Sequence, residues 1–181
     1  MRLRGIVQRL KNHFELFGLQ PGFALDRERL ERAYREIQAQ VHPDRFASAG
    51  DAERRASMQW TTRVNEAYRT LRSPVQRARY LLELAGVDVA FETNTSMPPE
   101  FLMRQMELRE ALEQAGDARD ADALDGLRDA LRADKRELER TLAEALDERG
   151  DHAGAAELTR KLKFLDKLDA EIDLAYEALE A

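Results

Sequence analysis

The 181-residue chain has no cysteine, and nowhere do about 18 apolar residues run together. Because cysteine is absent, we expect no disulfide framework, no thiolate nucleophile and no cysteine-based zinc site. Because long apolar runs are absent, we expect neither a membrane-spanning helix nor the apolar segment of a signal peptide. These absences predict a soluble, cytoplasmic protein that does not bind membranes.

Motifs for catalysis are also scarce. The chain has only three histidines, no His-Glu-x-x-His motif and no glycine-rich loop that would cradle phosphates. Metal catalysis and ATP hydrolysis by the chain itself are therefore not expected. We predict a protein that is not an enzyme and carries no cofactor.

Charge is abundant, since 35% of the residues are charged, and leucine and alanine are frequent. This composition is typical of long helices with well-solvated outer faces. Residues 1–86 hold 16 Lys and Arg against 10 Asp and Glu, whereas residues 87–181 hold 13 against 25. The division predicts two parts with different partners, and the net charge of −6 argues against nucleic-acid binding.

Apolar spacing and helix breakers predict four helices in the first part of the chain. They span about residues 13–17, 27–41, 52–72 and 74–85. Asp26 and Asp51 are predicted N-caps, and Gly86 is predicted to follow the last helix as its C-terminal glycine. The two long helices therefore form an antiparallel hairpin with a polar bend at its tip.

The bend consists of His42-Pro43-Asp44. Proline fixes its own φ, lacks an N–H and pushes the preceding residue out of the α region, so His42 should be the first residue after the helix. Taken alone, the tripeptide fits a plain turn whose aspartate caps the next segment. At the tip of a hairpin, its carboxylate can instead bind a partner arginine bidentately.

The second part begins after a linker, residues 87–97, in which the helical period is lost. Three amphipathic helices follow, at about residues 98–115, 118–149 and 152–179. Short turns at Gly116 and Gly150 join them, which predicts an antiparallel three-helix bundle. Asp134 and Lys135 interrupt the apolar stripe of the middle helix, so that seam is either locally polar or kinked.

The first helix of the bundle has more apolar residues than one buried stripe needs. At ~100° per residue, Phe101, Leu108 and Leu112 share a face. Three further apolar side chains point away from that face: Leu102, Met103 and Met106. They form either a wider core stripe or an exposed interaction patch, for which methionine is well suited. The residues that fringe or join such a patch are Glu107, Arg109, Glu110 and, from the last helix, Phe164.

Motifs in both parts resemble those of known proteins. The hairpin and its bend resemble a J-domain, the module by which co-chaperones stimulate the ATPase of DnaK-type chaperones; the matching segments are residues 34–46, 65–71 and 73–80. Residues 101–110 and 160–168 look like the HscB family, the J-domain co-chaperones of iron–sulfur cluster assembly. The resemblance covers roughly residues 12–180.

This resemblance implies an all-α fold that is L-shaped overall. Its parts are a basic N-terminal extension without an assigned role (1–11), a four-helix J-domain (12–86), a linker (87–97) and a three-helix scaffold-binding domain (98–181). The implied function is to stimulate a specialised DnaK-type chaperone, HscA, and to deliver the iron–sulfur scaffold IscU to it. The alternatives are a general J-domain protein for unfolded clients and a structural helical adaptor.

The resemblance also implies which residues bind each partner. The chaperone-binding residues would be His42, Pro43 and Asp44 of the bend, with Arg32, Arg35 and Arg45 beside it. Together these arginines can steer an acidic partner surface toward the bend. The scaffold-binding residues would be Leu102, Met103, Met106, Glu107, Arg109, Glu110 and Phe164.

Overall fold

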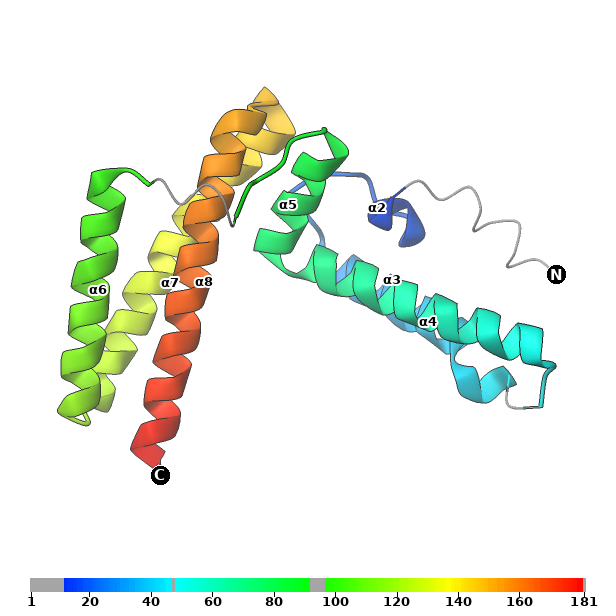
Figure 1. The fold of residues 1–181 in the computed structure, drawn as a ribbon, viewed down its shortest axis with the longest axis horizontal. Coiled ribbons are helices and arrows are strands. Elements are labelled where there is room, and N and C mark those ends of the chain that lie inside the picture. The colour runs from blue at the N-terminus through cyan, green and yellow to red at the C-terminus, as the bar shows by residue number, and fades with distance from the viewer. Residues whose placement is uncertain (1–11, 47, 92–96, 181) are drawn as a thin grey trace. The chain divides into compact units, whose positions relative to one another are not determined.

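The computed structural model describes residues 12–46, 48–91 and 97–180, and in these ranges all regular structure is helical (Figure 1). The elements in chain order are α2 (His13–Leu16), α3 (Arg27–Val41), η1 (Pro43–Phe46), α4 (Asp51–Arg72), α5 (Pro74–Leu84), α6 (Pro99–Asp117), α7 (Ala121–Ala143), η2 (Glu144–Arg149) and α8 (His152–Glu180). The all-α prediction is confirmed. The predicted extension, residues 1–11, and residues 92–96 of the predicted linker lie outside the described residues.

The chain divides into two compact units between Leu81 and Leu82, which lie inside α5. The predicted domain boundary at residue 86 and the predicted L-shaped arrangement stay predictions. The two units are therefore treated separately below, beginning with the one that carries the bend.

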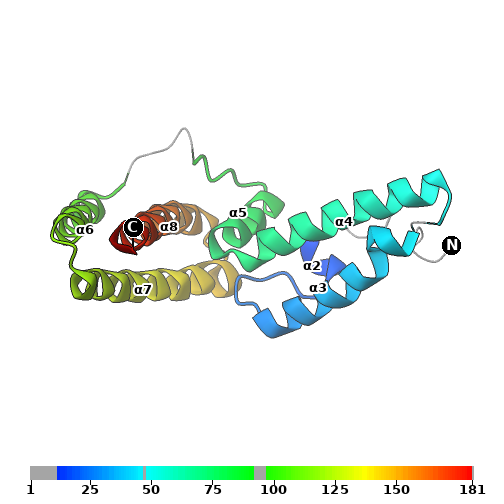
Figure 2. The same ribbon diagram turned by 90° about the horizontal axis from the view of Figure 1, so that it is seen from below.

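The N-terminal unit is built on α3 and α4, which run side by side in both views (Figures 1 and 2). Asp26 caps α3 as predicted, with its Oδ1 3.0 Å from the Arg29 amide. The side chains buried between the helices are Phe14, Phe17, Leu19, Leu30, Val41, Val64, Ala67 and Leu71. Full burial of each large apolar side chain contributes about 1.5–3 kcal/mol, so this core holds the hairpin together.

The start of α4 differs from the prediction. Gly50 occupies the N-cap position without a side-chain hydrogen bond, and Asp51 is the first helical residue. The prediction that Asp51 caps the helix is therefore wrong. Its carboxylate lies within the first turn, where the helix dipole favours negative charge, and 3.9 Å from the Arg54 guanidinium.

The C-terminal unit contains the predicted antiparallel three-helix bundle, formed by α6, α7 and α8 (Figure 1). Its innermost side chains are Leu108, Leu131, Leu165, Leu168 and Ile172. After α7 the chain makes one π-helical turn, η2, and ends it at Gly150 with a φ of 61°. Glycine adopts this left-handed conformation without steric cost, and the chain can then turn directly into α8.

The turn between α6 and α7 lies later than predicted. Gly116 is inside α6, which continues to Asp117, and the left-handed residue is Arg119, with a φ of 53°. The guanidinium of Arg119 donates to the Leu179 carbonyl at 2.7 Å, and this bond holds the turn against the end of α8. Placing the helix end at Gly116 was therefore wrong: the Arg119 and Asp120 amides close a local turn by donating to the Gly116 and Ala115 carbonyls at 3.0 and 2.9 Å.

The seam at Lys135 is polar, and α7 passes through it without a break. The Lys135 ammonium lies 2.6 Å from Asp166 and 2.9 Å from Asp169, both on α8. Burial lowers the pKa of Lys135, but the hydrogen bonds and charges of the two aspartates more than offset it, so the pKa is raised. Of the two sequence-based alternatives, the locally polar seam is confirmed.

Candidate functional site

The His-Pro-Asp bend lies where α3 ends and the 3₁₀ turn η1 begins. His42 is the first residue after α3, as predicted, with φ −57° and ψ 131°. The Asp44 amide donates to Nδ1 of His42 at 3.3 Å, and the Arg45 amide donates to the His42 carbonyl at 3.1 Å.

The Asp44 carboxylate is the most accessible part of the bend. Its side chain is 89% exposed, whereas that of His42 is 49% exposed, and Asp44 Oδ2 lies 3.5 Å from His42 Nδ1. A carboxylate with this exposure can accept further hydrogen bonds from a partner, and those from arginine are the strongest. The bend therefore presents an anion on a backbone with few free torsions.

Two sets of hydrogen bonds hold the bend to the hairpin. On its α3 side, the Val41 carbonyl accepts from Ser57 Oγ at 2.6 Å and from Thr61 Oγ1 at 3.2 Å, both on α4. On its η1 side, the Arg45 guanidinium donates to the Ala39 carbonyl at 3.1 Å. The sequence analysis missed Ser57 and Thr61, although two hydroxyls four residues apart on one helix face are a recognisable signal.

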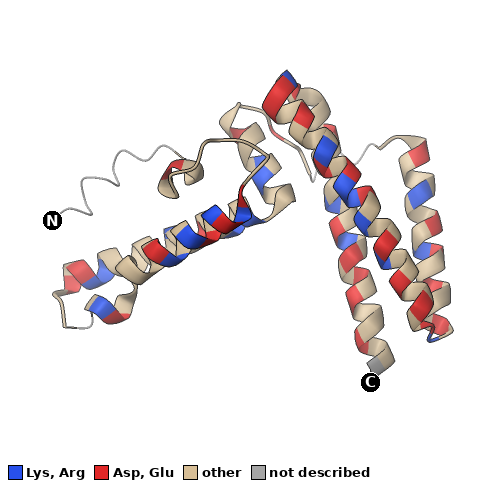
Figure 3. Cartoon of the chain, turned by 180° about the vertical axis from the view of Figure 1, so that it is seen from behind, with Lys and Arg blue, Asp and Glu red and all other residues tan. Residues whose placement is uncertain are grey.

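The predicted basic face of α3 is only partly basic. Arg32 pairs with Glu28 at 3.6 Å and Arg35 pairs with Glu31 at 3.2 Å, one turn earlier in each case. Figure 3 shows the two signs of charge interleaved along the hairpin. All four side chains are exposed, so these pairs are weak and salt-sensitive, and a charged partner can displace either member.

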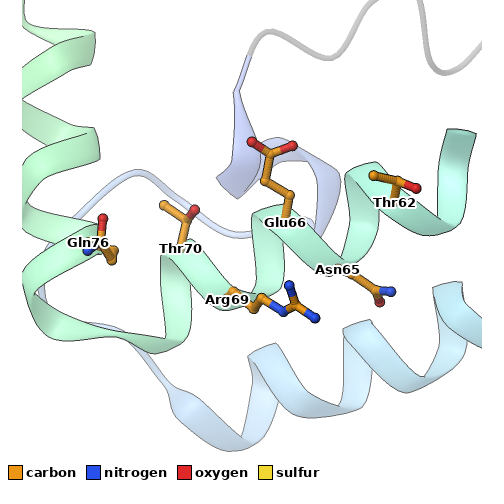
Figure 4. A pocket seen from close by; sticks show the side chains of 6 residues that line it. All are labelled: Thr62, Asn65, Glu66, Arg69, Thr70 and Gln76. Carbon is orange, nitrogen blue, oxygen red and sulfur yellow. The ribbon is translucent and has the colours of Figure 1, made fainter.

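A polar hollow of about 590 Å³ lies on another face of the hairpin unit, where α5 follows α4 (Figure 4). Its lining residues are Thr62, Asn65, Glu66, Arg69, Thr70 and Gln76. Asn65 is tied to α3, because its side-chain oxygen accepts from the Tyr34 hydroxyl at 2.9 Å. None of the predicted site residues lines this hollow.

The second candidate site is on the outer face of α6. Leu102, Met103 and Met106 are 44%, 62% and 70% exposed. Leu108, on the opposite face of α6, is 4% exposed and belongs to the core. The prediction of an exposed apolar patch is confirmed, and the alternative of a wider core stripe is wrong.

The charged residues around this patch differ in how they are held. The Arg109 guanidinium lies 3.3 Å from Glu171 of α8, which ties it to the bundle. Glu107 lies 3.6 Å from Arg104, an exposed pair within α6. Glu110 accepts from the Gln114 amide at 3.4 Å and is exposed. At ~100° per residue, Glu110 lies on the face of the patch, with Glu107 at one edge and Arg109 at the other, so its rim carries charges of both signs.

Phe164 reaches α6 from α8, as the sequence predicted. Its ring meets that of Phe101 edge to face, with the centroids 6.3 Å apart, and Phe101 itself packs against the core. Phe164 is partly buried, and its partner Phe101 lies on the core-facing side of α6 with Leu108, so the place of Phe164 in the patch stays a prediction.

Residues 12–46, 48–91 and 97–180 offer neither a metal-binding cluster nor a membrane-spanning helix. No group of three or more His, Asp or Glu side chains among them is arranged to hold a metal ion. No helix in those ranges is long and apolar enough to cross a membrane.

Comparison with known proteins identifies both units. Residues 12–80 match the DnaJ domain, and residues 97–173 match the HSCB C-terminal oligomerisation domain. Over 170 residues, the chain is 55% identical to the "Co-chaperone protein HscB homolog" of Azoarcus sp. (strain BH72), covering 94% of this chain and 96% of that protein. The chain belongs to the HscB family.

Solved structures of HscB proteins have the same fold. The chaperone HscB from Vibrio cholerae is 38% identical, with a TM-score of 0.82 over 93% of this chain and 99% of that one. The human co-chaperone HscB is 28% identical, with a TM-score of 0.84 over 92% of this chain and 82% of that one. As an HscB-family co-chaperone with a J-domain, the chain works with a chaperone ATPase as its partner.

Proposed function

We propose that this HscB-family chain stimulates the ATPase of a specialised DnaK-type chaperone, HscA, and delivers the iron–sulfur scaffold protein IscU to it. The observation that carries the proposal is the presence of two separate exposed features on one chain. One is an anionic His-Pro-Asp bend on a J-domain, and the other is an apolar patch on α6 of the HscB C-terminal domain. The chain acts as an adaptor in iron–sulfur cluster assembly and hydrolyses nothing itself.

The bend is the trigger in this proposal. Asp44 binds an arginine of the chaperone bidentately, while His42 and Pro43 hold the carboxylate in position. Arg32 and Arg35 give up their intrahelical glutamates and pair with acidic residues of the chaperone, so they mainly accelerate encounter. Arg45 is already bonded to Ala39, and its part is chiefly to keep η1 in place.

The α6 patch selects the client in this proposal. The exposed side chains of Leu102, Met103 and Met106 become buried against IscU when it binds. Each fully buried side chain of this size contributes about 1.5–3 kcal/mol to the binding free energy. Glu107, Glu110 and Arg109 form a rim of both signs, whose charges pair with polar groups at the border of the scaffold surface. Arg109 and Phe164 contact the scaffold from the α8 side.

One chain carrying both features changes the kinetics of assembly. When the scaffold is bound to the patch and the bend engages the chaperone, the encounter of scaffold and chaperone becomes nearly intramolecular. Effective concentrations for short linkers reach the millimolar range, so two weak contacts suffice for productive delivery. ATP hydrolysis is thereby timed to the arrival of the client.

The proposal is tested by steady-state ATP hydrolysis of purified HscA with the full chain, measured with and without IscU. We expect the chain to stimulate hydrolysis alone and IscU to raise the stimulation further. Absence of stimulation would refute the J-domain role. Equal enhancement by IscU and by an unfolded polypeptide would refute scaffold specificity and favour a general J-domain protein.

A further inference from the structure

The last carbonyl of α3 has no backbone partner in the bend. In a continuing helix the Arg45 amide would donate to the Val41 carbonyl, but here it donates to the His42 carbonyl. Val41 itself is buried, with 4% of its surface exposed. A buried carbonyl without a donor costs free energy, so its partners are expected to be specific.

Two hydroxyls of α4 replace the missing donor. Ser57 Oγ lies 2.6 Å from the Val41 oxygen and Thr61 Oγ1 lies 3.2 Å from it. They come from successive turns of α4, so both lone pairs of one carbonyl are used. A hydroxyl in a helix usually bonds within its own helix, as Thr62 does with the Met58 carbonyl at 3.1 Å.

We propose that Ser57 and Thr61 are positioning residues that aim the Asp44 carboxylate at the chaperone. This inference rests on the proposed J-domain function and adds two residues to it that touch no partner themselves. They act through the peptide between Val41 and His42, from which the bend begins.

The backbone segment from that peptide to Asp44 is short and has few free torsions. The two hydroxyl bonds fix the plane of the Val41–His42 peptide, and the pyrrolidine ring fixes φ of Pro43. The Arg45 amide then closes the turn onto the His42 carbonyl. Few torsions remain free between α4 and the Asp44 backbone, so the orientation of one peptide plane sets the position of the backbone from which the carboxylate extends.

The test compares the double variant Ser57→Ala/Thr61→Val with the full-length parent chain in HscA stimulation. We expect maximal stimulation to fall on the order of tenfold, since two hydrogen bonds that each bias the bend about threefold or more are lost. The concentration for half-maximal stimulation should change less than about twofold, because the arginines of α3 that govern encounter are intact. A purely structural role would not divide the two parameters in this way.

Matched variants sharpen the test. Thr62→Val removes a neighbouring hydroxyl that bonds within α4, and it should leave stimulation unchanged. Thr61→Ser keeps the hydroxyl and should retain stimulation where Thr61→Val loses it. The ¹³C shift of the Val41 carbonyl should move upfield in the double variant but not in Thr62→Val or Thr61→Ser. If the double variant unfolds, the single variants Ser57→Ala and Thr61→Val carry the same prediction at about threefold each.

The variant Asp44→Asn distinguishes failure of the positioning role from failure of the proposed function. If Asp44→Asn abolishes stimulation while the folded Ser57→Ala/Thr61→Val chain stimulates fully, the positioning role is refuted and the J-domain function stands. If Asp44→Asn also stimulates fully, the proposed function itself is refuted. Loss of stimulation in Thr62→Val to the same degree as in Thr61→Val would also refute the positioning role.

Discussion

The bend and the α6 patch are opposite solutions to the problem of binding a partner. The bend is a few polar residues held by hydrogen bonds to the His42 ring and to backbone carbonyls, and these bonds fix the backbone from which its exposed anion extends. The patch is a set of flexible apolar side chains on a regular helix, and none of the hydrogen bonds described above orients its methionines. One small change should therefore abolish binding by the bend, whereas binding by the patch should weaken in proportion to the apolar atoms removed.

The comparison explains how sensitive each site should be. Hydrogen bonds to charged groups depend steeply on geometry and charge, so an isosteric substitution at the bend should suffice to inactivate it. Apolar contact is non-directional and roughly proportional to buried area, so single truncations on the patch should be tolerated and should add together. The predictions below test this contrast, from the largest effect to the smallest.

Asp44→Asn should have the largest effect. The amide keeps the shape of the side chain but removes the charge, and stimulation of HscA should fall by on the order of 100-fold because the bidentate charged pair is lost. Affinity for IscU, measured by calorimetry, should be unchanged. Stimulation within twofold of the parent would contradict the trigger role of the bend.

Leu102→Ala/Met106→Ala should weaken IscU binding about 30-fold, because two side chains that become buried on binding are truncated. Helical content and melting temperature should stay at the parent values, since both residues are exposed. Leu108→Ala, on the buried face of the same helix, is the control and should lower the melting temperature instead. A double variant that unfolds would show that the patch is part of the core.

Lys135→Met should act on stability more than on either binding site. It leaves Asp166 and Asp169 facing each other without their cation, so the free energy of unfolding of the bundle should fall by about 1–2 kcal/mol. Exposed Lys167 on the same helix as the aspartates gives the control Lys167→Met, with little change. Stability equal to that of the parent would contradict a stabilising role for this polar seam.

The same seam predicts a pH dependence. Because the pKa of Lys135 is raised in the folded chain, its contribution to stability is fully present below about pH 10.5, the ordinary lysine value, and is lost as the pH rises through the folded pKa. Chemical unfolding of the parent and of Lys135→Met should therefore converge at strongly alkaline pH. A constant difference between them across that range would rule out the ion triad as its source.

Much of both sites was predictable because it depends on local rules. Proline chemistry placed His42 at the end of α3, and the 3.6-residue period separated Leu102 from Leu108. The errors have different origins. The hydroxyls of Ser57 and Thr61 became meaningful only once the alignment of α4 against Val41 was known, which is a contact distant in sequence. The start of α4 and the end of α6 depend on local structure and lie one or two residues from the positions that Asp51 and Gly116 predicted.

The adaptor proposal is tested most directly by mixing two chains that are each defective at one of the two sites. Asp44→Asn binds the scaffold but cannot trigger hydrolysis, and Leu102→Ala/Met106→Ala triggers hydrolysis but does not hold the scaffold. In HscA hydrolysis with IscU present, the account predicts that the mixture shows no enhancement by IscU beyond the sum of the separate chains, because trigger and client must be on one molecule. Restoration of the parent's full IscU-dependent enhancement by the mixture would contradict it.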